Sequence, residues 1–279
     1  MSTLTQLETN EQYHADHSHV SHSMLSVFRQ SRRVYRDRFV SRTQPPPEQT
    51  AAMRLGTLVH LAILEPDVFA TQCRVAPIVD RRTKAGKEIA AQFEAENAGK
   101  IIITPEENDI TGRIFEAVES STKSKQLLAM DGDVEASIRW RDRESGIQCK
   151  CRPDKFISSG LVIDLKTTRD ASPRGFARSC AALGYHRQAA WYLDGAREVL
   201  DANYNFVFIA LETSYPWTVA AYELDGDAID LGRNENRTAI MQVRDCMRNG
   251  DWREPHEKRV NLLSLPKWSV YANEWEIIE

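Results

Sequence analysis

Two aspartates and a lysine between Arg152 and Thr168 have the types and spacing for hydrolytic chemistry. Their segment, RPDKFISSGLVIDLKTT, holds two strand-like runs around a Ser-Ser-Gly turn, which predicts a β-hairpin. With residues 158–160 as the loop, Asp154 faces Asp164 across the hairpin, with Cβ atoms about 4.5–5.5 Å apart. Strand alternation returns Lys166 to the same face. Paired carboxylates repel unless a divalent cation lies between them, and hard oxygen ligands suit Mg²⁺ or Mn²⁺. The pattern therefore predicts metal-assisted phosphodiester hydrolysis.

An ordinary solvated strand face would also explain these charges. Charged residues make up about 25% of an average protein, so an Asp-x-Lys triplet is expected about once by chance in a chain of this length. The preceding Pro-Asp pair, the hairpin register and the apolar residues on the opposite face favour a site instead. Those apolar residues, which we expect to point into a core, are Leu161, Ile163 and Leu165.

A histidine on a predicted helix is a further candidate. The stretch from about Ala51 to Leu64, AAMRLGTLVHLAIL, is almost wholly apolar, which predicts a buried helix. His60 within it has two interpretations. It is either a hydrogen-bonded core histidine or a metal ligand, because neutral imidazole commonly binds metals.

A strand and a helix on either side of the hairpin carry other polar candidates. The run 134–142 alternates apolar and polar residues, so we expect a strand that pairs antiparallel with the first hairpin strand. Glu135 is then either a third carboxylate near the site or a solvent-facing glutamate. A helix beginning at the Ser-Pro pair and running over about residues 172–200 places Gln188 and Tyr192 on one stripe.

Basic residues gather in one glycine-containing loop, DRRTKAGKE, at residues 80–88. Basic loops are common surface features, but beside a phosphodiester site this loop would contact the phosphate backbone. The candidate DNA contacts are Arg81, Arg82, Lys84 and Lys87, together with Arg152 beside the hairpin.

The composition is typical of a soluble globular protein. The 279 residues include 42% hydrophobic and 27% charged side chains, enough for a large domain with an ample core. The net charge of −4 neither favours nor excludes nucleic-acid binding, since a basic groove can be offset by acidic residues elsewhere. No apolar run approaches the length of a membrane span and no signal peptide is apparent, so we expect a cytoplasmic protein without membrane contact.

The cysteines and the N-terminal histidines do not predict an additional metal site. The five cysteines form no Cys-x-x-Cys pair, so we interpret them as reduced structural thiols. Residues 1–20 are polar, and their histidine-rich stretch HADHSHVSH is more typical of a disordered tail than of a metal site. We expect a single domain over residues 21–279.

Together these motifs resemble the PD-(D/E)XK nuclease superfamily and, more narrowly, its RecE-type (exonuclease VIII-like) branch found in phages and prophages. The resemblance covers about residues 23–268. The motifs that carry it are GTLVHLAILEP with His60, RRTKAGK, EASIRW from Glu135, CKCRPD with Asp154, DLKTT with Asp164 and Lys166, and YHRQAAWY with Gln188 and Tyr192. The order His, Asp, Asp-x-Lys, Gln-x-x-x-Tyr is more specific than any one motif, and it favours the functional interpretations of His60 and Gln188.

The resemblance implies a fold and a role for each site residue. The fold is α/β (α+β), a restriction-endonuclease-like core with a central mixed β-sheet flanked by helices. Lys166 would position or activate the attacking water and stabilise the developing charge, and Gln188 and Tyr192 would orient the site. The implied ligands of Mg²⁺ or Mn²⁺ are His60, Asp154, Asp164 and the Leu165 carbonyl.

The resemblance also implies an activity and partners. The activity is a 5′→3′ exonuclease on linear double-stranded DNA that leaves 3′ single-stranded overhangs for a RecT-type annealing protein. Related enzymes form closed rings, so we expect a homo-oligomeric ring, with a tetramer favoured. Two alternatives stay open: a structure-specific or single-strand endonuclease of a mobile element, and a non-catalytic DNA-binding protein on the same fold. The complete set of site residues argues against the second alternative.

Overall fold

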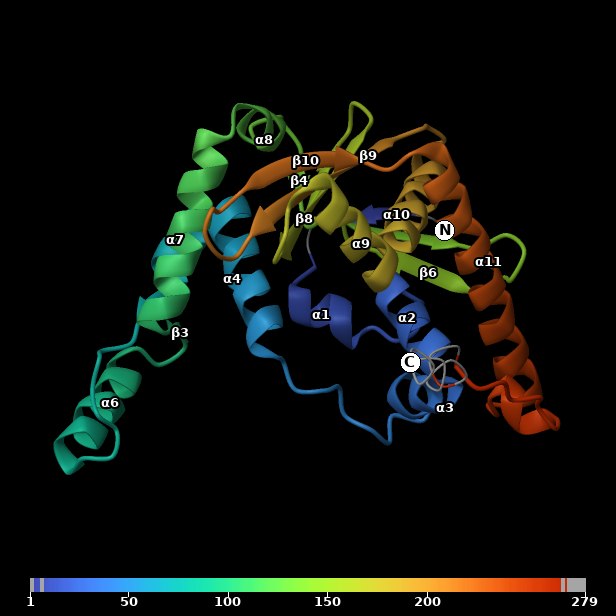
Figure 1. The fold of residues 1–279 in the computed structure, drawn as a ribbon, viewed down its shortest axis with the longest axis horizontal. Coiled ribbons are helices and arrows are strands. Elements are labelled where there is room, and N and C mark those ends of the chain that lie inside the picture. The colour runs from blue at the N-terminus through green and yellow to red at the C-terminus, as the bar shows by residue number, and fades with distance from the viewer. Residues whose placement is uncertain (1–2, 6–7, 267–268, 270–279) are drawn as a thin grey trace, which may run out of the picture.

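The computed structural model describes residues 3–5, 8–266 and 269, and the chain folds around a five-stranded mixed sheet (Figure 1). The strand order is β10-β9-β8-β7-β4, and only β8 and β9 are parallel neighbours. A parallel pair needs a crossover connection, which two helices between β8 and β9 provide. The strands are β4 Asp133–Val134, β7 Lys155–Ile157, β8 Leu161–Thr168, β9 Asn205–Glu212 and β10 Val219–Glu223. The mixed sheet flanked by helices is therefore confirmed.

The other elements cover this sheet or extend from it. Two small sheets consist of β1 Thr3–Thr5, β5 Ser137–Arg141 and β6 Gln148–Cys151, and of β2 Cys73–Val75 and β3 Ile101–Ile103. The helical elements are α1 Asn10–Ala15, α2 His22–Gln30, α3 Arg32–Tyr35, the π-helical turn η1 Arg36–Val40, α4 Ala51–Leu64, α5 Pro66–Gln72, α6 Lys84–Glu96, α7 Pro105–Ser120, α8 Thr122–Leu128, α9 Pro173–Leu183, α10 Tyr185–Leu200, α11 Gly226–Asn249 and the 3-10 turn η2 Pro255–Lys258.

The predicted hairpin is confirmed in its register. Ile157 pairs with Leu161 across the turn, and the ladder continues for two further pairs to Lys155 and Ile163. Gly160 closes the turn with φ +111°, a conformation that glycine adopts without a side-chain clash. One step beyond the ladder, Asp154 comes opposite the next residue of β8, which is Asp164.

The sheet separates two hydrophobic layers. On one face, residues of β7, β8 and β9, Ile163 and Leu165 among them, pack against α4, α7 and α8. On the other face lie α2, α9, α10 and α11 together with the three-stranded sheet. Figure 1 shows α4 and α7 on one side of the sheet and α9 to α11 on the other. Because side chains alternate along a strand, Asp164 and Lys166 point toward the second layer.

The N-terminal segment differs from the disordered tail expected for residues 1–20. Residues 10–15 form α1, and Tyr13 and Val20 are buried against the small sheet. The buried ammonium of Lys150 on β6 donates to the carbonyls of Tyr13 and Asp16. These contacts could not be predicted from the polar sequence of the segment, because the groups that hold it lie more than a hundred residues away in the chain.

Two predicted helices are each divided in the structure. The stretch expected as one helix over residues 105–130 breaks at Ser121, whose extended backbone ends α7 and precedes α8. The stretch expected over residues 172–200 breaks at Gly184, which has φ +75° and lies between α9 and α10. Ser172 accepts a hydrogen bond from Gly175 as the N-cap of α9, so the predicted start of that helix is confirmed.

The cysteines agree with the expectation of reduced structural thiols. All five are buried, and none forms a disulfide. No helix in the described part of the chain combines the length and apolarity needed to cross a bilayer.

The close packing of α10 on α11 gives a testable stability effect. A Cβ atom at Gly232 of α11 would lie 2.3 Å from the carbonyl oxygen of His186, so the backbone of α10 would have to move. We expect Gly232→Ala to lower the free energy of unfolding by about 1–3 kcal/mol in urea denaturation. The control is Gly112→Ala on the exposed side of α7, where no atom lies within 4 Å and alanine should stabilise the helix. Equal effects of the two changes would contradict the close approach.

Candidate active site

The hairpin brings the two predicted aspartates and the lysine together. Asp154 immediately precedes β7, and its Oδ2 accepts a hydrogen bond of 2.6 Å from the backbone amide of Leu165. Asp164 is buried in the middle of β8, and the ammonium of Lys166 forms an ion pair with its Oδ2. From α10, Gln188 Nε2 donates to Asp164 Oδ1 at 2.8 Å.

Burial and mutual repulsion set the charges of this cluster. Burial raises the pKa of Asp164 to about 6, and the charge of Asp154 adds to the shift while Lys166 opposes it. Burial also acts to raise the pKa of Asp154, but His60 and Lys166 outweigh it, so that pKa is lowered. For Lys166, burial acts to lower the pKa, yet the two carboxylates outweigh it and the pKa is raised. Lys166 is therefore an ammonium at neutral pH.

His60 reaches the site from α4, as its position in the predicted helix implied. Its Nδ1 lies 3.4 Å from Asp154 Oδ2, and the ring is partly buried. Burial acts to lower its pKa, but the charge of Asp154 and the hydrogen bond to it raise the pKa overall. His60 therefore lies beside the two aspartates and is paired with one of them, and its role as a metal ligand stays a prediction.

The stripe on α10 is also confirmed to face the site. Gln188 holds Asp164, and Tyr192 one turn later lines a pocket beside it. Tyr185, on the same stripe, lies under the ammonium of Lys166 at 5.0 Å from the ring centroid, and Phe208 of β9 lies at 6.0 Å. These rings fix the lysine by cation–π contact while leaving its hydrogen atoms available.

Glu135 lies near the two aspartates, which agrees with the expectation of a third carboxylate near the site rather than a solvent-facing glutamate. The expected continuous strand 134–142 is interrupted at this residue, whose φ of +51° separates β4 from β5. Its amide donates to the Asp154 carbonyl at 3.1 Å, and its carboxylate pairs with Arg152 at 2.8 Å. Arg152 also donates to the carbonyls of Glu135 and Glu8, so its guanidinium serves the architecture of the site. Its proposed DNA contact stays a prediction.

The basic loop lies apart from this cluster. Residues 80–88 lead into α6, which Figure 1 shows at the far end of an arm formed by α7 and the β2–β3 pair. The four predicted DNA contacts are exposed, and three of them have acidic neighbours: Arg81 pairs with Glu94, Arg82 with Asp80, and Lys84 with Glu88. A contact with DNA from this arm would therefore be separate from the chemistry at the hairpin.

The carboxylates of Asp154 and Asp164 and the imidazole of His60 are groups that commonly bind a divalent cation. Among the residues that the structure describes, no three His, Cys, Asp or Glu side chains are arranged to hold a metal ion as they stand. However, Asp164 Oδ2 is buried, and the ammonium of Lys166 is the partner that the described residues give it. A cation would take this oxygen and one of Asp154, and His60 would have to leave its pairing with Asp154 to join them. Leu165 as a carbonyl ligand stays a prediction.

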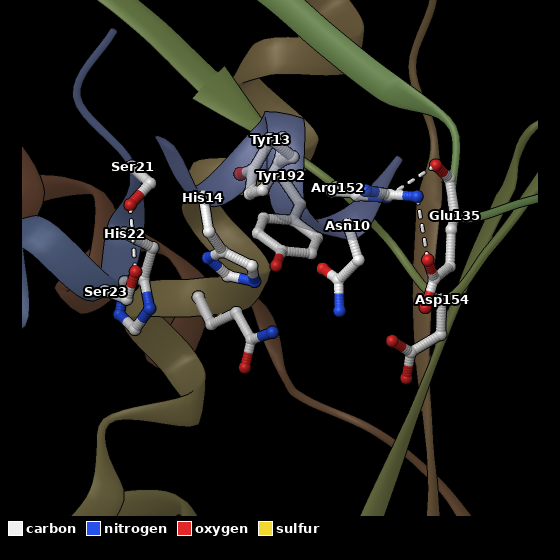
Figure 2. Close-up of a pocket in the computed structure, with 11 residues that line it drawn as sticks. Asn10, Tyr13, His14, Ser21, His22, Ser23, Glu135, Arg152, Asp154 and Tyr192 are labelled. Atoms are coloured by element: carbon white, nitrogen blue, oxygen red, sulfur yellow. Dashed lines mark hydrogen bonds and ion pairs between the residues drawn. The ribbon is translucent and has the colours of Figure 1, made fainter. Parts of the chain in front are cut away.

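Several residues that line the adjoining pocket were missed by the sequence reasoning. The pocket has a volume of about 340 Å³ and is bordered by Asp154, Glu135, Gln188 and Tyr192. Residues of the N-terminal segment form most of the remaining lining (Figure 2). These are Asn10, Tyr13, His14, Ser21, His22 and Ser23. The one signal was the recurrence of histidines, which alone is more typical of a tail.

Comparisons with known proteins concern the family and the fold of the chain. The model of a family described as a PDDEXK-like domain of unknown function (DUF3799) matches residues 21–259. None of the curated proteins matches the sequence. A candidate exonuclease from Eubacterium rectale has 15% identity and a TM-score of 0.60, with 95% of this chain and 98% of that chain covered. A phage-related exonuclease from Haemophilus somnus has 16% identity and a TM-score of 0.28, over 60% and 84% of the chains. The first likeness supports the fold alone, and the second is too weak to support an argument.

Proposed function

Because the chain belongs to the PDDEXK-like family DUF3799 and has the fold of PD-(D/E)XK nucleases, we propose that it is a divalent-metal-dependent DNA nuclease. The observation that carries this proposal is the buried pair Asp154 and Asp164 with Lys166 on the same strand face. More narrowly, we propose a RecE-type exonuclease that degrades one strand of linear duplex DNA from its 5′ end. The motif order His60, Asp154, Asp164-x-Lys166 supports this narrower assignment.

Each site residue then has a defined role. A divalent cation held by Asp154 and Asp164, with His60 and the Leu165 carbonyl as further ligands, would polarise the scissile phosphate and lower the pKa of the attacking water. Lys166 holds an ammonium at the same carboxylate, where it can orient that water and offset the charge that develops on phosphorus oxygens. Gln188 fixes Asp164 through Oδ1, which leaves Oδ2 directed at the reaction.

Digestion of end-labelled DNA tests this proposal. Linear duplexes labelled at either the 5′ or the 3′ end, beside a closed circle, are incubated with Mg²⁺, with Mn²⁺ or with EDTA. We expect metal-dependent loss of the 5′ label as mononucleotides and an intact circle. Cutting of the circle would replace the exonuclease by an endonuclease, and absence of cleavage with either metal would contradict the nuclease assignment.

The partners and assembly follow from the same proposal. We propose that the chain acts on DNA ends in a homo-oligomeric ring, with a tetramer favoured, and supplies overhangs to a RecT-type annealing protein in the cytoplasm. A ring explains processive digestion because it encloses the DNA. Light scattering at a range of protein concentrations measures the mass, and a monomer at all of them would contradict the ring.

The pairing of His60 with Asp154 predicts a pH-dependent metal affinity. Imidazole must lose its proton to bind a metal, and the raised pKa of His60 delays that loss. We therefore expect the affinity for Mn²⁺ to rise with pH as His60 and Asp164, whose pKa is about 6, lose their protons, and to level off above both pKa values. Isothermal titration in two buffers of different ionisation enthalpy counts the protons that are released. His60→Ala should weaken binding and release fewer protons, whereas His256→Ala at the exposed η2 turn should match the wild type. A pH-independent wild-type affinity would argue against His60 as a ligand.

A further inference from the structure

The pocket beside the carboxylates has a lining that the nuclease motifs do not explain. Its volume of about 340 Å³ falls in the range of about 300–1,000 Å³ typical of small-molecule sites. Asp154 and Gln188 form one part of the wall, so the pocket opens directly onto the groups that would hold the scissile phosphate. Asn10 and His14 come from α1, which precedes the matched family range 21–259. The family assignment therefore says nothing about them.

The charges of the pocket are wrong for a phosphate group. Arg152 is the one Arg or Lys side chain in its described lining, and it is neutralised by Glu135 at 2.8 Å. Burial lowers the pKa of His14, and it lowers the pKa of His22 to about 3, so both imidazoles are neutral at physiological pH. Asp154 adds a negative charge at the edge. An anion would be repelled here, whereas a neutral polar group would not.

The remaining groups suit a flat, hydrogen-bonding ligand. Tyr192 supplies aromatic surface, and the amides of Asn10 and Gln188 supply donors and acceptors. Figure 2 shows Asn10, His14 and Tyr192 pointing into the space that Asp154 borders. Aromatic side chains combined with amides are the usual means of holding an unstacked nucleobase.

We propose that this pocket holds the nucleobase and sugar of the terminal nucleotide of the strand being cut, with Asn10, His14 and Tyr192 as the residues that contact it. The inference rests on the proposed nuclease function and adds a base subsite to it. The base enters the pocket while the scissile phosphate lies at Asp154 and Asp164. The N-terminal segment is then part of the substrate site.

The anchoring of α1 fits this role. The ammonium of Lys150 donates hydrogen bonds to the carbonyls of Tyr13 and Asp16, and it lies 4.2 Å from the Tyr13 ring centroid. Arg139 of β5 pairs with Glu8 and, at 3.5 Å, with Asp16. A short helix of six residues held by buried and half-buried groups on both sides keeps its outward side chains in fixed positions. Asn10 and His14 are themselves exposed, so their replacement should leave the fold intact.

The test compares substrates that differ in one base. Two linear duplexes carry either a normal nucleotide or an abasic tetrahydrofuran residue at the 5′ end, and a second pair carries the same change at the 3′ end. For the strand that is attacked, wild type should remove the first abasic nucleotide about tenfold more slowly, the loss expected for one base–aromatic contact. An Asn10→Ala, His14→Ala double variant, which keeps Tyr192, should show a smaller preference than wild type. Glu11→Ala, on the exposed side of the same helix, should retain the wild-type preference.

A binding measurement separates this inference from the nuclease assignment. Fluorescence anisotropy in EDTA compares the affinity for the same duplexes without any cleavage, and wild type should prefer the end that carries a base. Equal rates and equal affinities of wild type for normal and abasic ends would overturn the base subsite even where the enzyme digests DNA. A double variant with the full wild-type preference would overturn the assignment of Asn10 and His14.

Discussion

Substitution of Lys166 by methionine should reduce the rate of DNA cleavage by about 10²–10⁴-fold while DNA binding persists. The ammonium lies on the same strand face as the two carboxylates and is held over the rings of Tyr185 and Phe208. Methionine keeps the unbranched apolar stem that packs against those rings, so it removes the charge and the hydrogen-bond donors with little change in volume. The two buried carboxylates lose their counter-charge, so some stability is lost as well, and the reaction rate is compared under conditions in which the variant is folded.

The control for this experiment is a lysine outside the site. Lys125→Met on α8 removes an exposed ammonium that pairs with Glu119, and it should leave the cleavage rate unchanged. Anisotropy in EDTA reports DNA binding, and thermal unfolding reports the fold. Lys166→Arg should recover little activity, because the planar guanidinium differs in shape and in placement of its donors. Wild-type cleavage by Lys166→Met would remove the lysine from the mechanism.

The residues that the sequence placed correctly are those whose positions follow from local geometry. Asp164 and Lys166 share a face because a strand alternates, and Asp154 comes opposite Asp164 because a three-residue turn sets the register. His60 was placed on the right helix by a continuous apolar stretch. These rules act over a few residues, so the sequence contains all that they need.

The features that the sequence did not place depend on contacts between distant segments. The role of α1 depends on Lys150, which lies 137 residues beyond Tyr13 in the chain. Glu135 needed a left-handed backbone, at φ +51°, that strand periodicity does not reveal. Arg152 was expected to contact DNA because it is basic, but its partners within the fold, Glu135 and Glu8, could not be read from its neighbours in sequence.

Replacement of Asp164 by asparagine should abolish cleavage. It should also remove the loss of stability that wild type shows as Asp164 becomes ionised. Burial, reinforced by Asp154, raises the pKa of Asp164 from 3.8 to about 6 in the folded protein. The stability contributed by the protonated carboxyl is therefore fully present below pH 3.8 and is lost as the pH rises through about 6. The asparagine side chain would stay neutral throughout. The stability of the Asp164→Asn variant relative to wild type should therefore increase as the pH rises through this window.

Comparison of slopes removes those effects of the substitution that do not depend on pH. The asparagine amide would face the ammonium of Lys166, but that contact does not titrate in this window. It therefore changes the free energy of unfolding by the same amount at each pH and leaves the slope against pH unchanged. The shift of Asp164 corresponds to a change on the order of 2–3 kcal/mol, since one pKa unit is about 1.4 kcal/mol. Asp154 does not interfere, because its lowered pKa places its own loss of stability at lower pH.

Urea unfolding in EDTA, near pH 4 and above pH 6, measures this difference, and repetition with Mg²⁺ measures the effect of the cation. Bound metal stabilises only the folded protein, by about 2.7 kcal/mol when its concentration is a hundred times the dissociation constant. Wild type should therefore gain stability with Mg²⁺ above pH 6 and Asp164→Asn should not. If the two proteins showed the same pH slope and the same response to Mg²⁺, Asp164 would be an ordinary buried carboxylate. The joint loss of the pH slope, the metal response and cleavage would instead show that the destabilising charge of this site is the charge that binds the cation.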